Sequence, residues 1–264
     1  MKRIVAVGLS CMALWMSWVS AVAAEPKMGV VVMHGKWGNP KGHVASFASA
    51  MERAGFVVES PDMPWSGRRL YDAGMDGLLA EIGAAMKSLR DKGATKICLA
   101  GHSIGAAGAI YYAGRAQVDC IIALAPGHNP ESSFMRSNTL SDTATAKAMV
   151  AEGKGDEKAP FGDYNTGNRT KKISMSAKVF LEYFDGDGPM NMATNASKIL
   201  PGTQVLWVVG QNESEGAKRN GGAAYQNIPA GVNKQFVEVP GGHLETPDKA
   251  IDLAPVWIRD IVKL

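Results

Sequence analysis

A serine between two glycines lies at residues 101–105, which read Gly101-His102-Ser103-Ile104-Gly105. This is the G-x-S-x-G pattern, in which the serine occupies a sharp strand-to-helix turn and a Cβ in place of either glycine would clash. The turn holds the Ser103 hydroxyl clear of the sheet. It also places Ser103 at a helix N-terminus, where unpaired backbone N–H groups favour a developing oxyanion. The pattern therefore indicates a serine nucleophile that attacks a carbonyl.

The residues on either side of this turn have the character that the pattern requires. Residues 97–100 form a short apolar run typical of a buried parallel strand, and residues 104–114 are rich in glycine and alanine, as in a helix pressed against a sheet. The alternative is a glycine-rich turn with an idle serine. A base and an acid that follow in the right order decide between the two interpretations.

On these residues the chain resembles the α/β-hydrolase family over nearly all of residues 25–264. The resemblance implies an α/β fold with a mostly parallel central sheet, flanking helices and an inserted lid. It implies a catalytic triad in the chain order nucleophile, acid, histidine. It also implies a small-molecule acyl substrate and no metal or organic cofactor.

The resemblance assigns the base to His243, which follows a last expected strand at 236–239 in a Pro-Gly-Gly-His loop. The acid belongs a few residues after the expected strand at 204–209, where Glu213 stands. The family commonly has aspartate there, but a glutamate can also accept the histidine Nδ1–H. Three other carboxylates remain alternatives for the acid: Glu215, Asp185 and Asp187.

In the family, the oxyanion hole is built from two backbone N–H groups, which here belong to Lys36 and Ile104. Lys36 and Trp37 are bulky for such a loop, so the N–H of Trp37 is an alternative to that of Lys36. We interpret His34 as a turn histidine bonded to backbone, because it precedes the serine.

Trp37, Trp65 and His102 are the residues expected to contact substrate. Packing against the sheet edge is the alternative for Trp65 and for Tyr71, its neighbour in the 60–76 loop.

The remaining pattern predicts one α/β domain with an insertion. Further strands are expected at 29–33, 56–59 and 120–125, and amphipathic helices at 44–53, 77–91 and 248–262. The lid is expected over about residues 127–184. Its polar part should contain a helix near 142–152 and an irregular stretch at 153–170, and residues 177–184 should form a helix rather than a strand.

The first 24 residues predict a secretory signal peptide. Lys2 and Arg3 precede an almost wholly apolar stretch at 4–19, and small residues at 21–24 offer a cleavage site. The mature domain would then span 25–264, be periplasmic or secreted, and have no stable membrane insertion. Loss of Lys2 and Arg3 lowers the formal net charge from +3 to +1. Because this charge is near zero and no basic stripe is present, we expect no nucleic-acid partner.

Two cysteines remain after such cleavage, Cys98 and Cys120, both in expected neighbouring strands. Export would permit a disulfide. Adjacent parallel strands rarely aim two Cβ atoms at each other, so the sequence favours two buried free thiols, with the bridge as the alternative.

The activity expected from these residues is that of a serine esterase that acts through an acyl-enzyme. Thioester, lactone and amide cleavage share the same machinery, so a peptidase is a second enzymatic interpretation. A binding protein on a hydrolase scaffold, without catalysis, is the alternative from another class of function.

Overall fold

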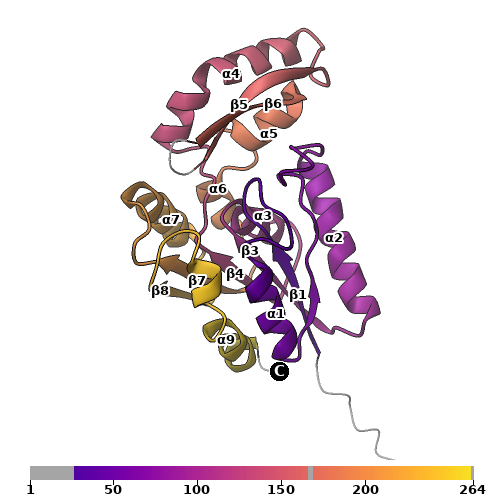
Figure 1. The fold of residues 1–264 in the computed structure, drawn as a ribbon, viewed down its shortest axis with the longest axis vertical. Helices are drawn as coiled ribbons and strands as arrows, with labels where there is room; N and C mark the ends of the chain where they lie inside the picture. Colours follow the sequence, from indigo (N-terminus) through magenta and orange to yellow (C-terminus); the bar gives the residue numbers. More distant parts are fainter. Residues whose placement is uncertain (1–26, 166–168, 263–264) are drawn as a thin grey trace, which may run out of the picture.

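Six parallel strands form the central sheet of the computed structural model, which describes residues 27–165 and 169–262 (Figure 1). Their order across the sheet is β2-β1-β3-β4-β7-β8. Their bounds are β1 Met28–Met33, β2 Val57–Glu59, β3 Lys96–His102, β4 Cys120–Leu124, β7 Gln204–Gly210 and β8 Lys234–Val239. The inner strands β1, β3, β4 and β7 are almost wholly buried, because helices cover both faces of the sheet.

Helices cover the two faces of the sheet in two separate cores. On one face, α1 (Ala45–Arg53) and α9 (Leu253–Val262) pack on side chains such as Val30 and Val32 of β1. On the other, α2 (Met75–Asp91) and α3 (Ile104–Ala113) pack on Val31 and Met33. Two further helices, α6 (Met192–Ala196) and α7 (Glu215–Asn227), contribute to this second core. The mostly parallel sheet with flanking helices confirms the fold class predicted from the sequence.

An insertion between β4 and α6 lies next to the sheet domain in Figure 1. It consists of α4 (Ser133–Ala151), the antiparallel strands β5 (Lys158–Asn165) and β6 (Arg169–Ser176), and α5 (Ala177–Phe184). Phe161 of β5 stacks on Phe180 of α5 with ring centroids 4.4 Å apart, and Phe180 stacks in turn on Phe184. These rings belong to the same buried cluster as the core on the α2 and α3 face of the sheet, and Phe184 also contacts Tyr71, so the insertion packs onto the sheet domain.

The expectation of irregular structure over residues 153–170 is wrong, because the hairpin of β5 and β6 occupies most of this stretch. Only Ile173 and Met175 of β6 are buried, and its other side chains are exposed or partly exposed. So few apolar positions among lysines and threonines give a weak strand pattern. Residues 177–184 form a helix, as predicted, with the hydroxyl of Ser176 as the N-cap acceptor for Val179 N–H.

The last expected helix, residues 248–262, is divided into α8 (Thr246–Lys249) and α9. Pro255 explains the break. A proline has no N–H to donate to the carbonyl four residues earlier, and its ring clashes with that carbonyl, so it is tolerated in the first turn of a helix but not in its interior. The helix therefore restarts at Leu253, two residues before Pro255.

Cys98 and Cys120 form a disulfide, contrary to the free thiols that the sequence favours. The reason is the register of β3 and β4, which pairs these two residues directly across the ladder with their Cα atoms 4.5 Å apart. That separation lies within the range of disulfides. The two cysteines are 22 residues apart in the sequence, and closing a loop of about that length stabilises a folded chain by about 3 kcal/mol in the chain-entropy account.

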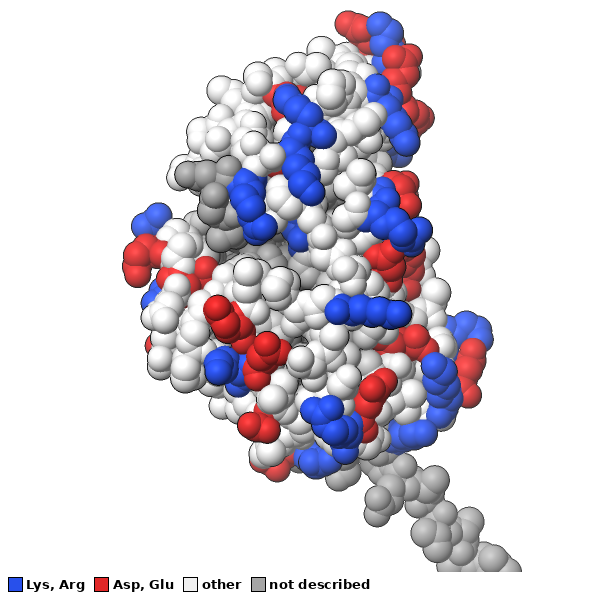
Figure 2. All heavy atoms as spheres, in the orientation of Figure 1, with Lys and Arg blue, Asp and Glu red and all other residues white. Residues whose placement is uncertain are grey.

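The surface carries charges of both signs. Basic and acidic side chains are interspersed on the face shown in Figure 2. Among the residues that the structure describes, no helix is both long enough and apolar enough to cross a membrane. The signal peptide expected over residues 1–24 lies outside the described residues.

Candidate active site

Ser103 occupies the sharp turn between β3 and α3 that the sequence predicts. Its backbone has φ 58° and ψ −119°, a sparsely populated conformation that costs of order 1–3 kcal/mol and persists only when its surroundings enforce it. The N–H of Ser103 donates to the carbonyl of Leu124, 3.0 Å away, which ties the turn to the end of β4. A Cβ at Gly105 would lie 2.6 Å from the carbonyl oxygen of Met33, so the close packing of this turn requires glycine.

Glu213 and His243 contact each other, although 30 residues separate them. Glu213 follows β7, His243 follows β8, and the carboxyl ends of parallel strands share one edge of the sheet. His243 Nδ1 lies 2.5 Å from Glu213 Oε2, while Oε1 accepts the N–H of Ser214. A carboxylate at this distance accepts a proton from Nδ1, which leaves Nε2 of the ring as a proton acceptor.

The pKa of Glu213 lies below its ordinary value. Burial alone would raise this pKa, but the hydrogen bond to His243, the nearby imidazole charge and the N–H of Ser214 outweigh that effect. The side chain is therefore a carboxylate at neutral pH and in mild acid.

This depressed pKa predicts how stability depends on pH. Because the folded pKa is lower than the unfolded one, ionised Glu213 contributes stability above its ordinary pKa of 4.5, and this contribution disappears as the pH falls through the folded value. We expect the unfolding free energy of Glu213→Gln to fall less steeply than that of the wild type below pH 4.5. Urea unfolding of both proteins at a series of pH values measures this, and equal slopes would contradict the pKa shift.

Ser103 Oγ and the His243 ring both lie against Gly127. A Cβ added to Gly127 would lie 2.9 Å from Ser103 Oγ and 3.3 Å from Cε1 of His243. Within residues 27–165 and 169–262, no hydrogen bond joins Ser103 Oγ to His243. Contacts between a nucleophile and its base are often long without substrate and tighten in the Michaelis complex.

The alternative acids lie elsewhere. Asp185 forms an ion pair with Lys147 of α4, and Asp187 forms one with Arg136. Glu215 is exposed in the first turn of α7. Of the four carboxylates considered, the structure places only Glu213 against His243.

Ile104, one expected oxyanion donor, follows Ser103 directly, and Lys36, the other, follows Gly35, which packs against Ser103. Ile104 begins α3, and the first N–H groups of a helix have no partner within it. The backbone N–H of Lys36 makes no backbone hydrogen bond to any residue that the structure describes. The N–H of Trp37, the alternative to Lys36, donates to the carbonyl of Trp65 at 2.9 Å and is therefore already engaged.

Two cavities meet at Ser103 and His243. The first has a volume of about 360 Å³, and its wall includes Gly127, His128, Phe134, Met135 and Tyr164. The second has a volume of about 510 Å³, and its wall includes His34, Trp37, His43, His102 and Leu244. Lys36 and Asn165 line both. A substrate with its reacting carbonyl at Ser103 would thus have room for a group on each side.

The three residues expected to contact substrate have different positions. Trp37 lines the second cavity. Trp65 does not line either cavity: it is fully buried, donates its indole N–H to the carbonyl of His34, and packs where Gly108 has no side chain. The assignment of Trp65 to the substrate site is therefore wrong. Tyr71 is likewise buried.

His102 borders the second cavity but is almost fully buried, with Nε2 2.9 Å from the carbonyl oxygen of His243. Burial and the neighbouring His243 lower its pKa to about 3, so the ring is neutral at pH 7. A neutral ring next to a carbonyl oxygen donates Nε2–H to it. His102 thus holds the backbone of His243 in place, which the sequence did not indicate.

His34 is bonded to backbone, as the sequence predicts. Nδ1 lies 2.8 Å from the carbonyl oxygen of Gly35, and Nε2 accepts the N–H of Met63. Burial lowers the pKa of His34, which agrees with a neutral ring that donates through one nitrogen and accepts through the other.

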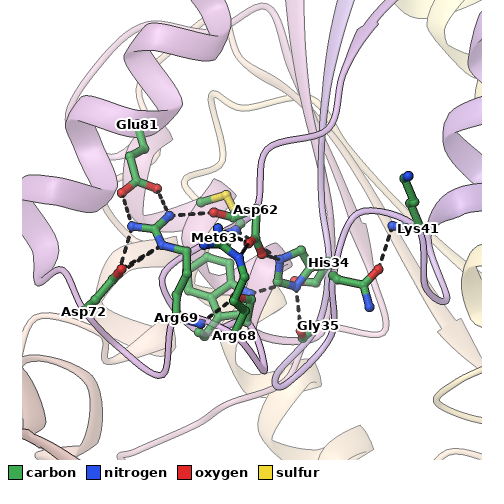
Figure 3. A network of polar contacts seen from close by, with 12 residues as sticks. His34, Gly35, Lys41, Asp62, Met63, Arg68, Arg69, Asp72 and Glu81 are labelled. Atoms are coloured by element: carbon green, nitrogen blue, oxygen red, sulfur yellow. Dashed lines mark hydrogen bonds and ion pairs between the residues drawn. The ribbon is translucent and has the colours of Figure 1, made fainter.

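A network of ion pairs holds the 60–72 loop, which packs against His34 (Figure 3). Arg69 binds both oxygens of Glu81 on α2 and also contacts Asp72 and the carbonyl of Asp62. Arg68 binds the Asp62 carboxylate. Bidentate pairs of this kind fix geometry as well as add energy. The network fixes the 60–72 loop, which in turn holds His34 and Trp37 through backbone contacts.

The residues of the candidate site that sequence reasoning missed lie in the insertion and in the loop after β4. Tyr164 and Asn165 of β5 line the cavities, as does Gly127 after β4. Asp163 is completely buried and contacts Lys36, Trp37 and Tyr71. No pattern in the sequence around Asp163 distinguishes it from an exposed aspartate.

Comparison with solved structures places this architecture in a known class. A carboxyl esterase from Bacillus coagulans is 17% identical, with 90% of this chain and 91% of that chain covered at a TM-score of 0.63. A monoacylglycerol lipase from Paleococcus ferrophilus is 20% identical, with 87% of this chain and 93% of that chain covered at a TM-score of 0.61. Est1E from Butyrivibrio proteoclasticus, solved with ferulic acid bound, is 18% identical, with 90% of this chain and 89% of that chain covered at a TM-score of 0.61.

No protein-family model matches the sequence, and no curated protein matches it either. The structural similarity covers nearly the whole of each of the three chains. Together with the parallel sheet and the serine turn after β3, it shows that the chain has the α/β-hydrolase fold.

Proposed function

We propose that the protein is a serine hydrolase that cleaves carboxylic esters or related acyl bonds of small molecules. The observation that carries the proposal is the convergence of Ser103, His243 and ionised Glu213 where two cavities meet. The solved structures that share the fold include an esterase and a lipase, which agrees with ester cleavage. Their low identity to this chain leaves the chemistry to be argued from its own residues.

The reaction begins with proton transfer from Ser103 to Nε2 of His243 as Oγ attacks the substrate carbonyl carbon. Glu213 accepts Nδ1–H and stabilises the imidazolium that forms. The N–H groups of Lys36 and Ile104 bind the oxyanion. The carbon–oxygen bond to the leaving alcohol then breaks, and His243 gives the proton to that alcohol. Water, deprotonated by His243, then attacks the acyl carbon. The bond from that carbon to Ser103 Oγ breaks, His243 returns its proton to Oγ, and the acid is released.

The insertion serves as a lid in this proposal, because Met135 and Phe134 of α4 and Tyr164 of β5 form much of the wall of the first cavity. Such walls select substrates by size more than they take part in the chemistry. We also propose that residues 1–24 direct export and that the mature protein acts in the periplasm or outside the cell.

A fluorophosphonate probe tests the proposal directly, because it phosphonylates only an activated serine. We expect the wild type to be labelled and Ser103→Ala to remain unlabelled at the same folded concentration. Aryl esters of increasing acyl length then report the size that the cavities accept. A folded wild type that is neither labelled nor active on any ester would refute the enzymatic proposal and favour a binding protein on this scaffold.

A further inference from the structure

Asp163 of the insertion is a buried carboxylate that three donors from the sheet domain surround. The side chain has no exposed surface. Lys36 Nζ lies 2.5 Å from Oδ1, while the Trp37 indole N–H and the Tyr71 hydroxyl donate to Oδ2 at 2.6 and 2.9 Å. A charge that is so fully buried needs partners of this kind, and removing one partner of a buried pair destabilises a protein strongly.

The donors come from two loops, of which the loop after β1 packs against Ser103 through Gly35. Lys36 and Trp37 follow β1, and Tyr71 precedes α2. Trp37 and Tyr71 both have left-handed backbones, with φ of 57° and 60°. Residues with a Cβ adopt this region at a cost in free energy and stay there when surrounding contacts enforce it. The two hydrogen bonds to Oδ2 are contacts of that kind.

Lys36 connects the Asp163 carboxylate with a second group of the insertion that borders the site. Lys36 Nζ also donates to the carbonyl oxygen of Tyr164 at 2.7 Å, and Tyr164 and Asn165 line the first cavity. Lys36 therefore has its side chain held by the insertion, while its backbone N–H lies in the loop next to Ser103. A shift of β5 would move both the cavity wall and this N–H.

We propose that Asp163 is a positioning residue for the oxyanion hole, which it serves by fixing the Lys36 main chain through the Lys36 and Trp37 side chains. The inference rests on the proposed function, because it takes the Lys36 N–H as an oxyanion donor. It assigns the inserted hairpin a part in catalysis besides substrate selection.

Asp163→Asn tests the inference in the full chain. Lys36 contacts Oδ1 whereas Trp37 and Tyr71 contact Oδ2, so in either orientation the amide –NH₂ faces a donor. An oxyanion donor acts mainly in the transition state, and displacement of a catalytic group by about 1 Å costs about 100-fold. We therefore expect kcat on an aryl ester to fall by about 10- to 100-fold with KM changed less than about threefold.

Asp142→Asn is the matched control. Asp142 accepts the N–H of Gly162, the residue before Asp163, and pairs with Lys172, but both of these contacts lie within the insertion. If Asp163 only stabilised the insertion, both variants would raise KM and change kcat alike. Equal losses of kcat in the two variants, or a kcat of Asp163→Asn within about twofold of the wild type, would overturn the proposal.

A second pair of variants covers the case in which Asp163→Asn does not fold. Tyr71→Phe removes one donor to Asp163, whereas Tyr183→Phe removes a hydroxyl that donates to the carbonyl of Ala73 instead. We expect kcat to fall about threefold or more in the first and to stay unchanged in the second. Equal values would refute the role of Asp163. A folded wild type that is neither labelled nor active on any ester would instead refute the proposed function, so the two failures are distinguishable.

Discussion

Replacing Glu213 with Gln is expected to lower kcat by about three to four orders of magnitude, with little change in KM. The N–H of Ser214 donates to Oε1 of Glu213, so a glutamine keeps its carbonyl oxygen there. The amide –NH₂ then faces Nδ1 of His243, which must become the unprotonated nitrogen. Nε2 carries the proton in that tautomer and is unable to accept one from Ser103.

Steady-state hydrolysis of an aryl ester, combined with the rate of fluorophosphonate labelling, measures this loss. Glu245→Gln is the matched control, because Glu245 accepts the N–H of Gly242 in the same loop as His243 and does not contact the ring. We expect its kcat to stay within a few-fold of the wild-type value. A Glu213→Gln enzyme within about tenfold of the wild type would show that another group orients His243.

The positions of the proposed catalytic residues were predictable because they depend on topology. In a parallel sheet the carboxyl ends of the strands share one edge, so Ser103, Glu213 and His243, each placed after a strand, come together once the strands are ordered. The strands themselves are short apolar runs with buried faces, which is the strongest pattern a sequence offers. The choice among four carboxylates required coordinates, because loop conformation decides which of them reaches the ring.

The insertion was not predictable to the same extent. Only two side chains of β6 are buried, and Asp163 of β5 is buried because donors 92 to 127 residues away in the chain surround it. Aspartate side chains are mostly exposed in proteins, and no pattern in the neighbouring sequence indicates partners so far away in the chain. The wrong assignment of Trp65 has a related cause, since a tryptophan in a loop was placed at the surface although Gly108 leaves room for its ring in the core.

The glycines of the serine turn are a second place where sequence alone gives the physical reason, and Gly101→Ala is expected to show it. A Cβ at Gly101 would collide with the backbone carbonyl group of Gly105 and lie 2.6 Å from the backbone nitrogen of Ala106. Backbone atoms of α3 are less able to yield than side-chain ends. We expect the unfolding free energy to fall by more than about 3 kcal/mol, above the usual cost of overpacking, because α3 must move away from β3.

Gly222→Ala provides the reference for this variant. Gly222 lies within α7, and a Cβ there would meet no atom within 4 Å, so alanine should stabilise the helix by about 0.5–1 kcal/mol. Urea unfolding measures both changes, and fluorophosphonate labelling shows whether Ser103 stays reactive. Gly222→Ala should be labelled like the wild type, whereas Gly101→Ala should be labelled far more slowly, since α3 carries the Ile104 N–H. Equal stability of the two variants would mean that the turn tolerates a side chain, so that steric exclusion does not explain the glycines at its two ends.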